Sequence, residues 1–308
     1  MFTHKHLVVV VDSAEDNMTA LQKAELLMAK VGARLTLFSS GYNSTLANNH
    51  PFDKDTTEKA KEAYIHRMKL SLEEKAEPLR EKGYEVDCVT MWDKHPSQAI
   101  IHYLEDNPTD LVVKSTHHQN VMQRTLFSHL DWDLIRYSPV PLLLTKGASW
   151  NHGQTLSITA SVDPIHTNEK PAKMDQEILA DSLRLAKELE AELSVLHVYD
   201  PTPLLIYLDQ PTVDAGEISE QIRKQHQDAL NELVAPYDID PTHVYLETGS
   251  PGTMIPDFLY QNDSHLVVMG ALARKGLDRI LIGHTAERIL DRINADIMVV
   301  KVLQEEGS

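Results

Sequence analysis

The sequence predicts an α/β protein made of two tandem domains, each built around a parallel β-sheet. Three observations support this fold class. A chain of 308 residues is long for one compact core, so two domains of about 150 residues each are expected. Short apolar runs alternate with amphipathic helical segments, which is the pattern of a parallel sheet covered by helices. The order of these segments also repeats along the chain.

The first half contains five expected strands separated by four expected helices. The run at residues 7–11 is apolar, rich in β-branched residues and too short for a helix, so it predicts a strand buried on both faces. Leu21, Ala24 and Leu27 recur at helical spacing and predict an amphipathic helix that ends at Gly32. The expected strands are residues 7–11, 35–39, 85–91, 111–114 and 141–145, and the expected helices are residues 18–31, 57–82, 96–105 and 126–137.

A polar segment with two glycines, residues 146–154, predicts a linker, after which the pattern starts again. It separates a first domain at residues 1–147 from a second at residues 154–304. In the second domain, the fourth strand is expected to stop at Gly270. The expected strands are residues 156–162, 193–199, 243–247, 266–269 and 297–302, and the expected helices are residues 176–190, 219–234, 251–261 and 284–294.

The two halves match one another position by position. Asp12 and Asp163 each close a first strand, and residues 86–146 overlay residues 241–301 without a gap at a constant offset of 155. A gapless match with the same order of elements indicates a duplication. The last strand of each half would be a sheet edge. We expect these edges to pair about a pseudo-two-fold axis, so that one chain is equivalent to a dimer.

Composition narrows the classes of function. The formal net charge of −17 argues against a general nucleic-acid-binding surface, because phosphate backbones attract the opposite sign. No segment approaches the roughly 20 apolar residues of a membrane span, and no cleavage site follows the N-terminus. The single cysteine, Cys88, cannot form an internal disulfide, which fits a reducing compartment. We therefore expect a cytoplasmic protein, with Cys88 as a packed thiol rather than a redox centre.

A strand, a glycine-containing loop and a helix start follow one another near the C-terminus. Met269 and Gly270 close the strand, and Gly283 opens the helix. Backbone N–H groups in such an arrangement can cradle a phosphate. The loop between them carries Arg274, Lys275 and Arg279, which are local cations in an acidic protein. The alternative is a turn and helix entry that serve only the fold, and the residues leave both interpretations open.

These features together resemble the tandem universal stress proteins of Gram-negative bacteria, over nearly the whole chain. The carriers are Asp12, Asp163, the paired Leu-Val-Val strands and the block that ends in Gly283-His-Thr-Ala-Glu287. The resemblance implies two five-stranded parallel-sheet domains of the adenine nucleotide alpha hydrolase-like, Rossmann-like type, related by a pseudo-two-fold axis. Nucleotide-binding members carry the pattern Gly-x2-Gly-x9-Gly-Ser/Thr.

Carried over residue by residue, the pattern is partly kept in the second domain. Gly270 and Gly283 match its first and third glycines. Ala273 replaces the middle glycine, and its Cβ would hinder close approach of a ligand to the backbone. His284 replaces the Ser/Thr, with Thr285 one place later. The resemblance also places Asp163 near the adenosine and the second strand, near His197 and Val198, on the base side. The candidate residues for ATP or another anionic ligand are Asp163, Val198, Met269, Gly270, Ala273, Arg274, Gly283, His284 and Thr285.

The first domain departs further from the pattern. Ser115, His118 and Ser128 stand at the three glycine positions. Asp131, at the helix start, is expected to cap the helix and to repel phosphate. We therefore expect no ATP site in this half, which would instead supply the fold, an interface or a different pocket.

Two other constellations are weaker. Histidines invite a metal hypothesis, above all His117 and His118 with His95 and His129, but no motif with metal-ligand spacing occurs, so a structural or solvent-facing role is favoured. Ser128, His129 and Asp131 have the residue types of a catalytic triad, but sequence neighbours rarely form one, so we expect no catalytic residue.

The resemblance implies a non-catalytic stress-response protein that supports survival of stress such as DNA damage or starvation. Protein partners, and possibly a homodimer, are expected, with no nucleic-acid or membrane partner and no certain cofactor. One alternative is a weak ATP-hydrolysing or small-molecule-converting enzyme that uses Asp163, Gly270, Gly283 and Thr285. Another is a carrier of an apolar ligand, with the apolar stretch at residues 201–216 as a lid.

Overall fold

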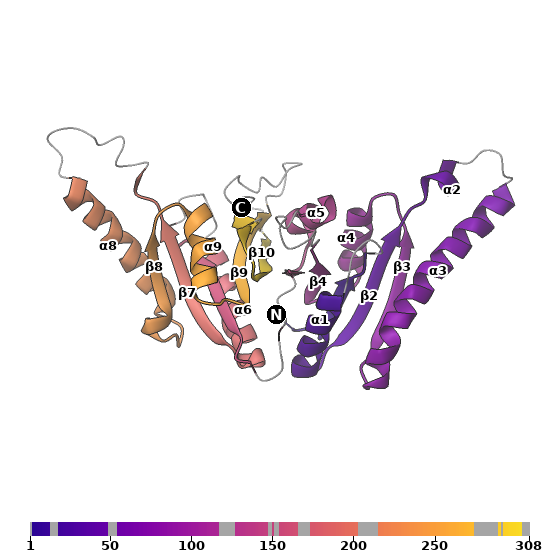
Figure 1. Ribbon diagram of the computed structural model, residues 1–308, viewed down its shortest axis with the longest axis horizontal. Coiled ribbons are helices and arrows are strands. Elements are labelled where there is room, and N and C mark those ends of the chain that lie inside the picture. Colours follow the sequence, from indigo (N-terminus) through magenta and orange to yellow (C-terminus); the bar gives the residue numbers. More distant parts are fainter. Residues whose placement is uncertain are drawn as a thin grey trace, which may run out of the picture. The chain divides into compact units, whose positions relative to one another are not determined.

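The computed structural model describes residues 2–12, 18–48, 54–116, 127–146, 150, 154–165, 173–202, 215–273, 289–290 and 292–303. Contacts between elements divide this part of the chain into two compact units (Figure 1). Unit 1 contains the described residues up to Lys146, and unit 2 contains those from Trp150 onward.

Unit 1 is a five-stranded parallel sheet in the order β3-β2-β1-β4-β5, and each neighbouring pair of strands is parallel. Its strands are β1 (His6–Val10), β2 (Arg34–Gly41), β3 (Val86–Trp92), β4 (Leu111–Ser115) and β5 (Leu142–Thr145). Its helices are α1 (Met18–Val31), α2 (Ser44–Asn48), α3 (Lys54–Glu81), α4 (Pro96–Asp106) and α5 (His129–Tyr137).

Unit 2 repeats this design, with five parallel strands in the order β10-β9-β6-β7-β8. Its strands are β6 (Ser157–Val162), β7 (Glu192–Tyr199), β8 (Val244–Thr248), β9 (Leu266–Ala273) and β10 (Asp296–Leu303). Its helices are α6 (Lys173–Leu189), α8 (Ala215–Val234) and α9 (Pro251–Gln261), with a 3-10 turn η1 (Pro241–His243). The prediction of two five-stranded parallel-sheet domains is confirmed.

Burial in unit 1 follows from the crossovers between parallel strands. Every residue of β1 and β4 is buried, as expected for central strands covered on both faces, and every residue of β5, the last strand in this order, is buried as well. The chain runs β1-α1-β2-α3-β3 in one direction across the sheet and then returns through α4 and α5. Because such crossovers are right-handed, α1 and α3 cover one face while α4 and α5 pack together on the other. The connections diverge between β1 and β4, which is where open α/β sheets bind ligands.

The structure bears out the repeat. The bounds of α4 and α9 differ by 155 at both ends, and β4 and β9 begin at Leu111 and Leu266, at the same offset. The first helix of each unit is followed directly by a residue with positive φ, namely Gly32 at 64° and Glu190 at 53°. Glycine adopts this left-handed conformation without strain, whereas Glu190 does so at a cost.

Several segments differ from the prediction. β9 does not stop at Gly270, because the pairing with β10 continues to Ala273. α8 begins at Ala215, four residues earlier than predicted, so the apolar stretch at residues 201–216 ends inside a helix. Residues 203–214 lie outside the described part of the chain. The predicted linker contains a buried side chain, because only 8% of Trp150 is exposed.

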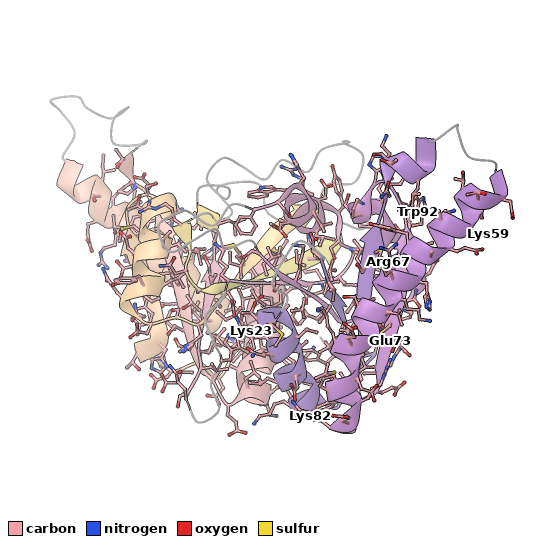
Figure 2. All side chains as sticks on the ribbon, turned by 45° about the vertical axis from the view of Figure 1, so that its right-hand side comes forward. Lys23, Lys59, Arg67, Glu73, Lys82 and Trp92 are labelled. Atoms are coloured by element: carbon pink, nitrogen blue, oxygen red, sulfur yellow. The ribbon has the colours of Figure 1, made fainter. Side chains whose placement is uncertain are left out.

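α3 is the long outer helix of unit 1. Figure 2 shows Lys59, Arg67 and Glu73 along its length. Near its end, Arg80 pairs with Glu73 at 2.5 Å and donates to the Val86 carbonyl and to Cys88 Sγ. Cys88 is half-buried, and burial followed by the Glu73 charge raises the pKa of its thiol to about 11. Among the described residues, no helix has the length and apolar character needed to cross a membrane.

Candidate ligand-binding sites

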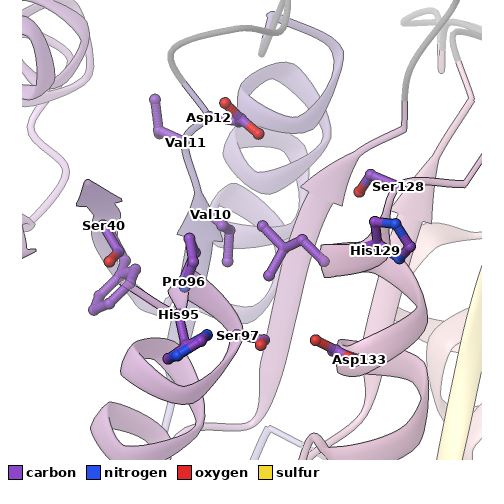
Figure 3. A pocket seen from close by; sticks show the side chains of 12 residues that line it. Val10, Val11, Asp12, Ser40, His95, Pro96, Ser97, Ser128, His129 and Asp133 are labelled. Atoms are coloured by element: carbon purple, nitrogen blue, oxygen red, sulfur yellow. The ribbon is translucent and has the colours of Figure 1, made fainter. Parts of the chain in front are cut away.

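Unit 1 contains a cavity of about 410 Å³ at the carboxyl ends of its strands (Figure 3). That volume lies in the range of small-molecule sites. The walls come from the ends of β1 and β2 and from the first turns of α4 and α5. Among the residues that the structure describes, twelve line it, namely Val10, Val11, Asp12, Phe38, Ser40, His95, Pro96, Ser97, Ser128, His129, Leu130 and Asp133.

Two helix N-termini meet at this cavity, and they differ in how they are capped. α4 begins with His95 as its N-cap and Pro96 in its first turn, and no side chain caps it. Proline suits this position because the first N–H groups of a helix lack intrahelical partners. α5 begins after Ser128, which forms a full capping box with Asp131. The second helix therefore presents satisfied donors to the cavity, whereas the first does not.

The capping box of α5 is part of a buried ion pair. The Asp131 N–H donates to Ser128 Oγ at 3.1 Å, and Asp131 Oδ2 accepts from the Ser128 N–H at 2.7 Å. Asp131 Oδ1 lies 2.9 Å from Lys114 Nζ, and both side chains are 0% exposed. Lys114 Nζ also donates to the Ser115 carbonyl at 2.9 Å. The expectation that Asp131 caps the helix is confirmed, and its carboxylate closes the site where an external anion would bind.

Lys114 was not identified from the sequence, although a signal was present. It is the one charged residue of the run Leu-Val-Val-Lys-Ser in β4, whose residues are all buried. A lysine in such a strand requires an anionic partner, because a buried unpaired charge is costly. At the offset of 155, unit 2 carries Met269 and Ala286 in place of Lys114 and Asp131. Both residues of the ion pair are therefore present in the first half, and both are replaced by uncharged residues in the second half.

Four of the candidate residues of unit 2 lie at one edge of its sheet. Asp163 directly follows β6, Val198 is near the end of β7, and Met269 and Gly270 lie in the middle of β9, level with the end of β6. The Asp163 N–H donates to Asp175 Oδ1 of α6 at 3.0 Å, which fixes the backbone of the turn. The backbone of Ala273 ends β9. Arg274, Gly283, His284 and Thr285 lie outside the described residues.

Gly270 has a packing role that explains its lack of a side chain. A Cβ at this position would lie 2.5 Å from Met174 Sδ and 2.6 Å from its Cγ. Real Cβ atoms do not approach so closely, so a side chain at residue 270 would force the Met174 side chain of α6 to shift. At the equivalent position of unit 1, Ser115 is tolerated, and its Oγ lies 3.2 Å from Thr19 Oγ1 of α1. The first glycine of the loop pattern thus serves the fold, whatever else it does.

His197 of β7 faces α8. Its Nδ1–H donates to the Val162 carbonyl at 3.1 Å, so in the neutral pair its Nε2 accepts the 2.7 Å hydrogen bond from His226 Nδ1 of α8. The His226 ring also stacks on Tyr199, with centroids 4.3 Å apart. Burial lowers the pKa of His226, and the charge of Asp163 opposes that shift. Because neighbours on a strand point to opposite faces, Val198 is the one of the two that faces away from α8.

The described residues support neither the metal hypothesis nor the catalytic-triad hypothesis. His117 and His118 lie outside the described residues. His95 and His129 line the same cavity, but no three histidine, cysteine or carboxylate side chains come together as a metal-binding group in the described part of the chain. The Ser128 hydroxyl donates to Asp131 Oδ2 at 2.8 Å, which leaves it bonded to a carboxylate and not to a histidine.

Comparison with known proteins assigns the family. The universal stress protein family matches residues 3–146 and again residues 173–301. The chain belongs to the universal stress protein family. Universal stress protein E of Salmonella typhi is 26% identical over 305 residues, covering 98% of this chain and 95% of that protein. The Universal stress protein E homolog of Haemophilus influenzae is 24% identical, covering 96% and 97%.

Solved structures agree on the fold of this universal stress protein. A functionally unknown protein from Pseudomonas aeruginosa PAO1 has a TM-score of 0.72 at 23% identity, covering 97% of this chain and 93% of that chain. A universal stress protein from Archaeoglobus fulgidus has a TM-score of 0.66 at 17% identity, covering 97% and 99%. The family match on both halves shows that two universal stress domains stand in tandem.

Proposed function

We propose that this tandem universal stress protein is a non-catalytic, cytoplasmic stress-response protein in which only the second domain takes a nucleotide or another anionic small ligand. Its role is the survival of stress such as DNA damage or starvation, exerted through protein partners. Support for the role comes from the family match over both halves and from the Universal stress protein E relatives that span almost the whole chain.

One observation supports the proposal that the second domain, and not the first, binds the ligand. In unit 1 the N-terminus of α5 is occupied by the Asp131 carboxylate, and Lys114 is already paired with it. A triphosphate would have to displace a tethered carboxylate and separate a fully buried ion pair, which is costly. In the second domain Gly283, His284 and Thr285 occupy the corresponding stretch, and Ala286 stands at the position of Asp131. The position of Asp131 therefore carries no carboxylate in that half.

The two strand-ending aspartates supply a matched test. ATP is titrated by calorimetry into the full chain and into the Asp163→Asn and Asp12→Asn variants. We expect Asp163→Asn to weaken ATP binding at least tenfold and Asp12→Asn to leave it within twofold, with Gly283→Asp abolishing it. Absence of ATP binding at millimolar concentration would refute the nucleotide proposal. Binding that depends on Asp12 would refute the assignment to the second domain.

The stress role is tested separately in cells. Cells that lack this chain are expected to survive ultraviolet irradiation and starvation less well than the parent, and the wild-type gene is expected to restore survival. Equal survival under both stresses contradicts the proposed role. Steady phosphate release from ATP that disappears in Asp163→Ala would favour the alternative of a weak ATP-hydrolysing enzyme. An apolar molecule that copurifies with the native chain would favour the carrier alternative.

A further inference from the structure

The helix α8 is held on the sheet of unit 2 by few buried side chains. Among its residues whose side chains the structure describes, only His226 and Leu230 are buried, whereas α6 of the same unit buries nine residues. Figure 1 shows α8 as the outer helix beside β7 and β8. Because burial of apolar side chains is the main force that docks a helix on a sheet, the docking of α8 depends strongly on the contacts of His226.

We propose that the His197–His226 pair is a proton-sensitive latch, which holds α8 against β7 at neutral pH and releases it in acid. The basis is the 2.7 Å hydrogen bond between two buried imidazoles, since only 1% of His197 and 9% of His226 is exposed. His197 belongs to β7 and His226 to α8, so the bond joins the helix to the sheet. The proposal concerns unit 2 alone and does not rest on nucleotide binding.

The hydrogen bonds define which ring nitrogen atoms carry protons. The Val162 carbonyl can only accept, so His197 Nδ1 donates to it and His197 Nε2 keeps a lone pair. That lone pair accepts from His226 Nδ1. A protonated His197 would present an N–H group to the N–H group of His226, so the bond exists only while His197 is neutral.

The pair can take up a first proton only on His226. A proton on His226 Nε2 leaves the hydrogen bond intact but places a charge on a buried ring, which is unfavourable. That ring is stacked on His197, with centroids 5.0 Å apart, as well as on Tyr199. Burial lowers the pKa of His226 below the ordinary value of 6.5, and the opposing charge of Asp163 does not cancel this shift.

The other titratable groups around the pair come from four elements. On β8, Tyr245 packs on Phe258 of α9, so Tyr245 and its neighbour but one, Glu247, face away from α8. The described groups that border the pair are Asp163 after β6, Asp175 of α6, Tyr199 of β7, and Arg223 with its partner Glu220 on α8. Of these, Asp163 is the charge that acts on His226, and it acts against the effect of burial.

The sign of the pH dependence follows from the lowered pKa. A released α8 exposes His226, whose pKa then returns to about 6.5. Between the lowered and the ordinary value the released helix binds more protons than the docked helix. Docking is therefore strongest above about pH 6.5 and weakens as the pH falls below it, by at most about tenfold per pH unit for one histidine.

Hydrogen exchange of the full chain measures this release. The protection of backbone amides is followed by mass spectrometry at pH 7.5, 6.5 and 5.5, with exchange times scaled to the intrinsic rate at each pH. We expect the protection factors of α8 to fall between about threefold and tenfold from pH 7.5 to pH 5.5. Those of α6, in the same unit, should change less than twofold, because only α8 is released.

Variants assign the effect to the pair. In His226→Asn, the asparagine Nδ2 can still donate to His197, but the side chain does not titrate, so the fall in α8 protection should shrink to less than twofold. His243→Asn, which removes another histidine of unit 2, should keep the wild-type fall. Thermal unfolding checks that each variant is folded, and His226→Phe, which keeps a stacked ring, replaces the asparagine variant if that one is not.

Three results would overturn the proposal. The first is that α8 keeps its protection at pH 5.5. The second is that α6 loses protection to the same extent as α8, which would mean that the whole of unit 2 unfolds in acid. The third is that the variant without a titratable side chain at position 226 retains the wild-type pH dependence. The wild-type series decides the first two results without any variant.

Discussion

Removal of the Asp131 carboxylate tests the buried ion pair most directly. Asp131→Ala deletes one partner of a pair in which both side chains are 0% exposed and leaves the Lys114 ammonium buried without its counter-ion. Breaking such a pair costs about 3–5 kcal/mol. The substitution also removes the capping box of α5, which is worth about 1 kcal/mol. We expect unit 1 to lose about 4–6 kcal/mol of its free energy of unfolding.

The second domain suggests how to rescue this loss. Lys114→Met alone should cost about 3–5 kcal/mol, because it leaves Asp131 buried without its cation. The double variant Lys114→Met/Asp131→Ala carries the residue types found at positions 269 and 286. It leaves no buried charge at either position, so it should lose only the cap and some packing, about 1–2 kcal/mol. The coupling energy of the two positions should therefore reach about 5 kcal/mol or more.

The assay must report on unit 1 alone, because a chain of two domains does not unfold in one transition. In the Trp150→Phe background the remaining tryptophans, Trp92 and Trp132, both lie in unit 1. Urea unfolding of the full chain, followed by the fluorescence of these two tryptophans, gives the stability of the parent, of the two single variants and of the double variant, which together form a double-mutant cycle. Asp133→Ala, a carboxylate on the same helix without a described ion pair, should change stability by less than about 1 kcal/mol. A double variant as unstable as the sum of its single variants would refute the reasoning.

Three further predictions concern packing and titration. Gly270→Ala should destabilise unit 2 by about 1–3 kcal/mol in urea unfolding, because the new Cβ meets the Met174 side chain. In a Met174→Ala background the same substitution should cost less. Equal costs in the two backgrounds would contradict the contact. Cys88 should react with iodoacetamide at pH 8 about 100-fold more slowly in the folded chain than in urea, because burial raises the pKa of its thiol to about 11. The Glu73→Gln variant should react faster than the wild type, because the Glu73 charge contributes to this rise. Folded and unfolded rates within tenfold of one another would show that the thiol is normal. Burial lowers the pKa of the Lys301 ammonium from 10.5 to about 7. Between these two values the unfolded chain binds more protons than the folded chain. The free energy of unfolding of unit 2 should therefore rise with pH from 7 toward 10, by at most about 1.4 kcal/mol per pH unit. Urea midpoints at pH 7 and pH 9 measure this rise, and an equal slope in Lys301→Met would show that another group causes it.

Much of the fold follows from local pattern in the sequence. The central strands are continuous apolar runs, and the helices show helical spacing, so element type and order are predictable. The ends of elements are less so, because pairing decides them. β9 runs past Gly270 since β10 offers partners as far as Leu303, and no residue of β9 encodes that length. Likewise, glycine suggested the end of a strand, whereas Gly270 lies within β9 and leaves room for the Met174 side chain of a distant helix.

The candidate site was harder to predict than the fold. The capping role of Asp131 was predictable from its place three residues after Ser128. Its pairing with Lys114 was not, because the two residues lie on different elements and meet only when α5 packs beside β4. The cavity of unit 1 likewise combines four elements, so Ser40, Ser97 and Asp133 carry no local signal. The assignment of Arg274, Gly283, His284 and Thr285, and the pairing of the two final strands, stay predictions.

The tethering of Asp131 has a consequence for what the first domain can sense. A dissolved anion occupies a site to an extent set by its concentration, whereas a carboxylate on the same chain is present at a fixed, high effective concentration. The helix start of α5 is therefore saturated at every level of cellular phosphate compounds. On the proposal that only the second domain takes an anionic ligand, a change in the concentration of that ligand would alter the occupancy of the second domain and leave the α5 helix start unchanged.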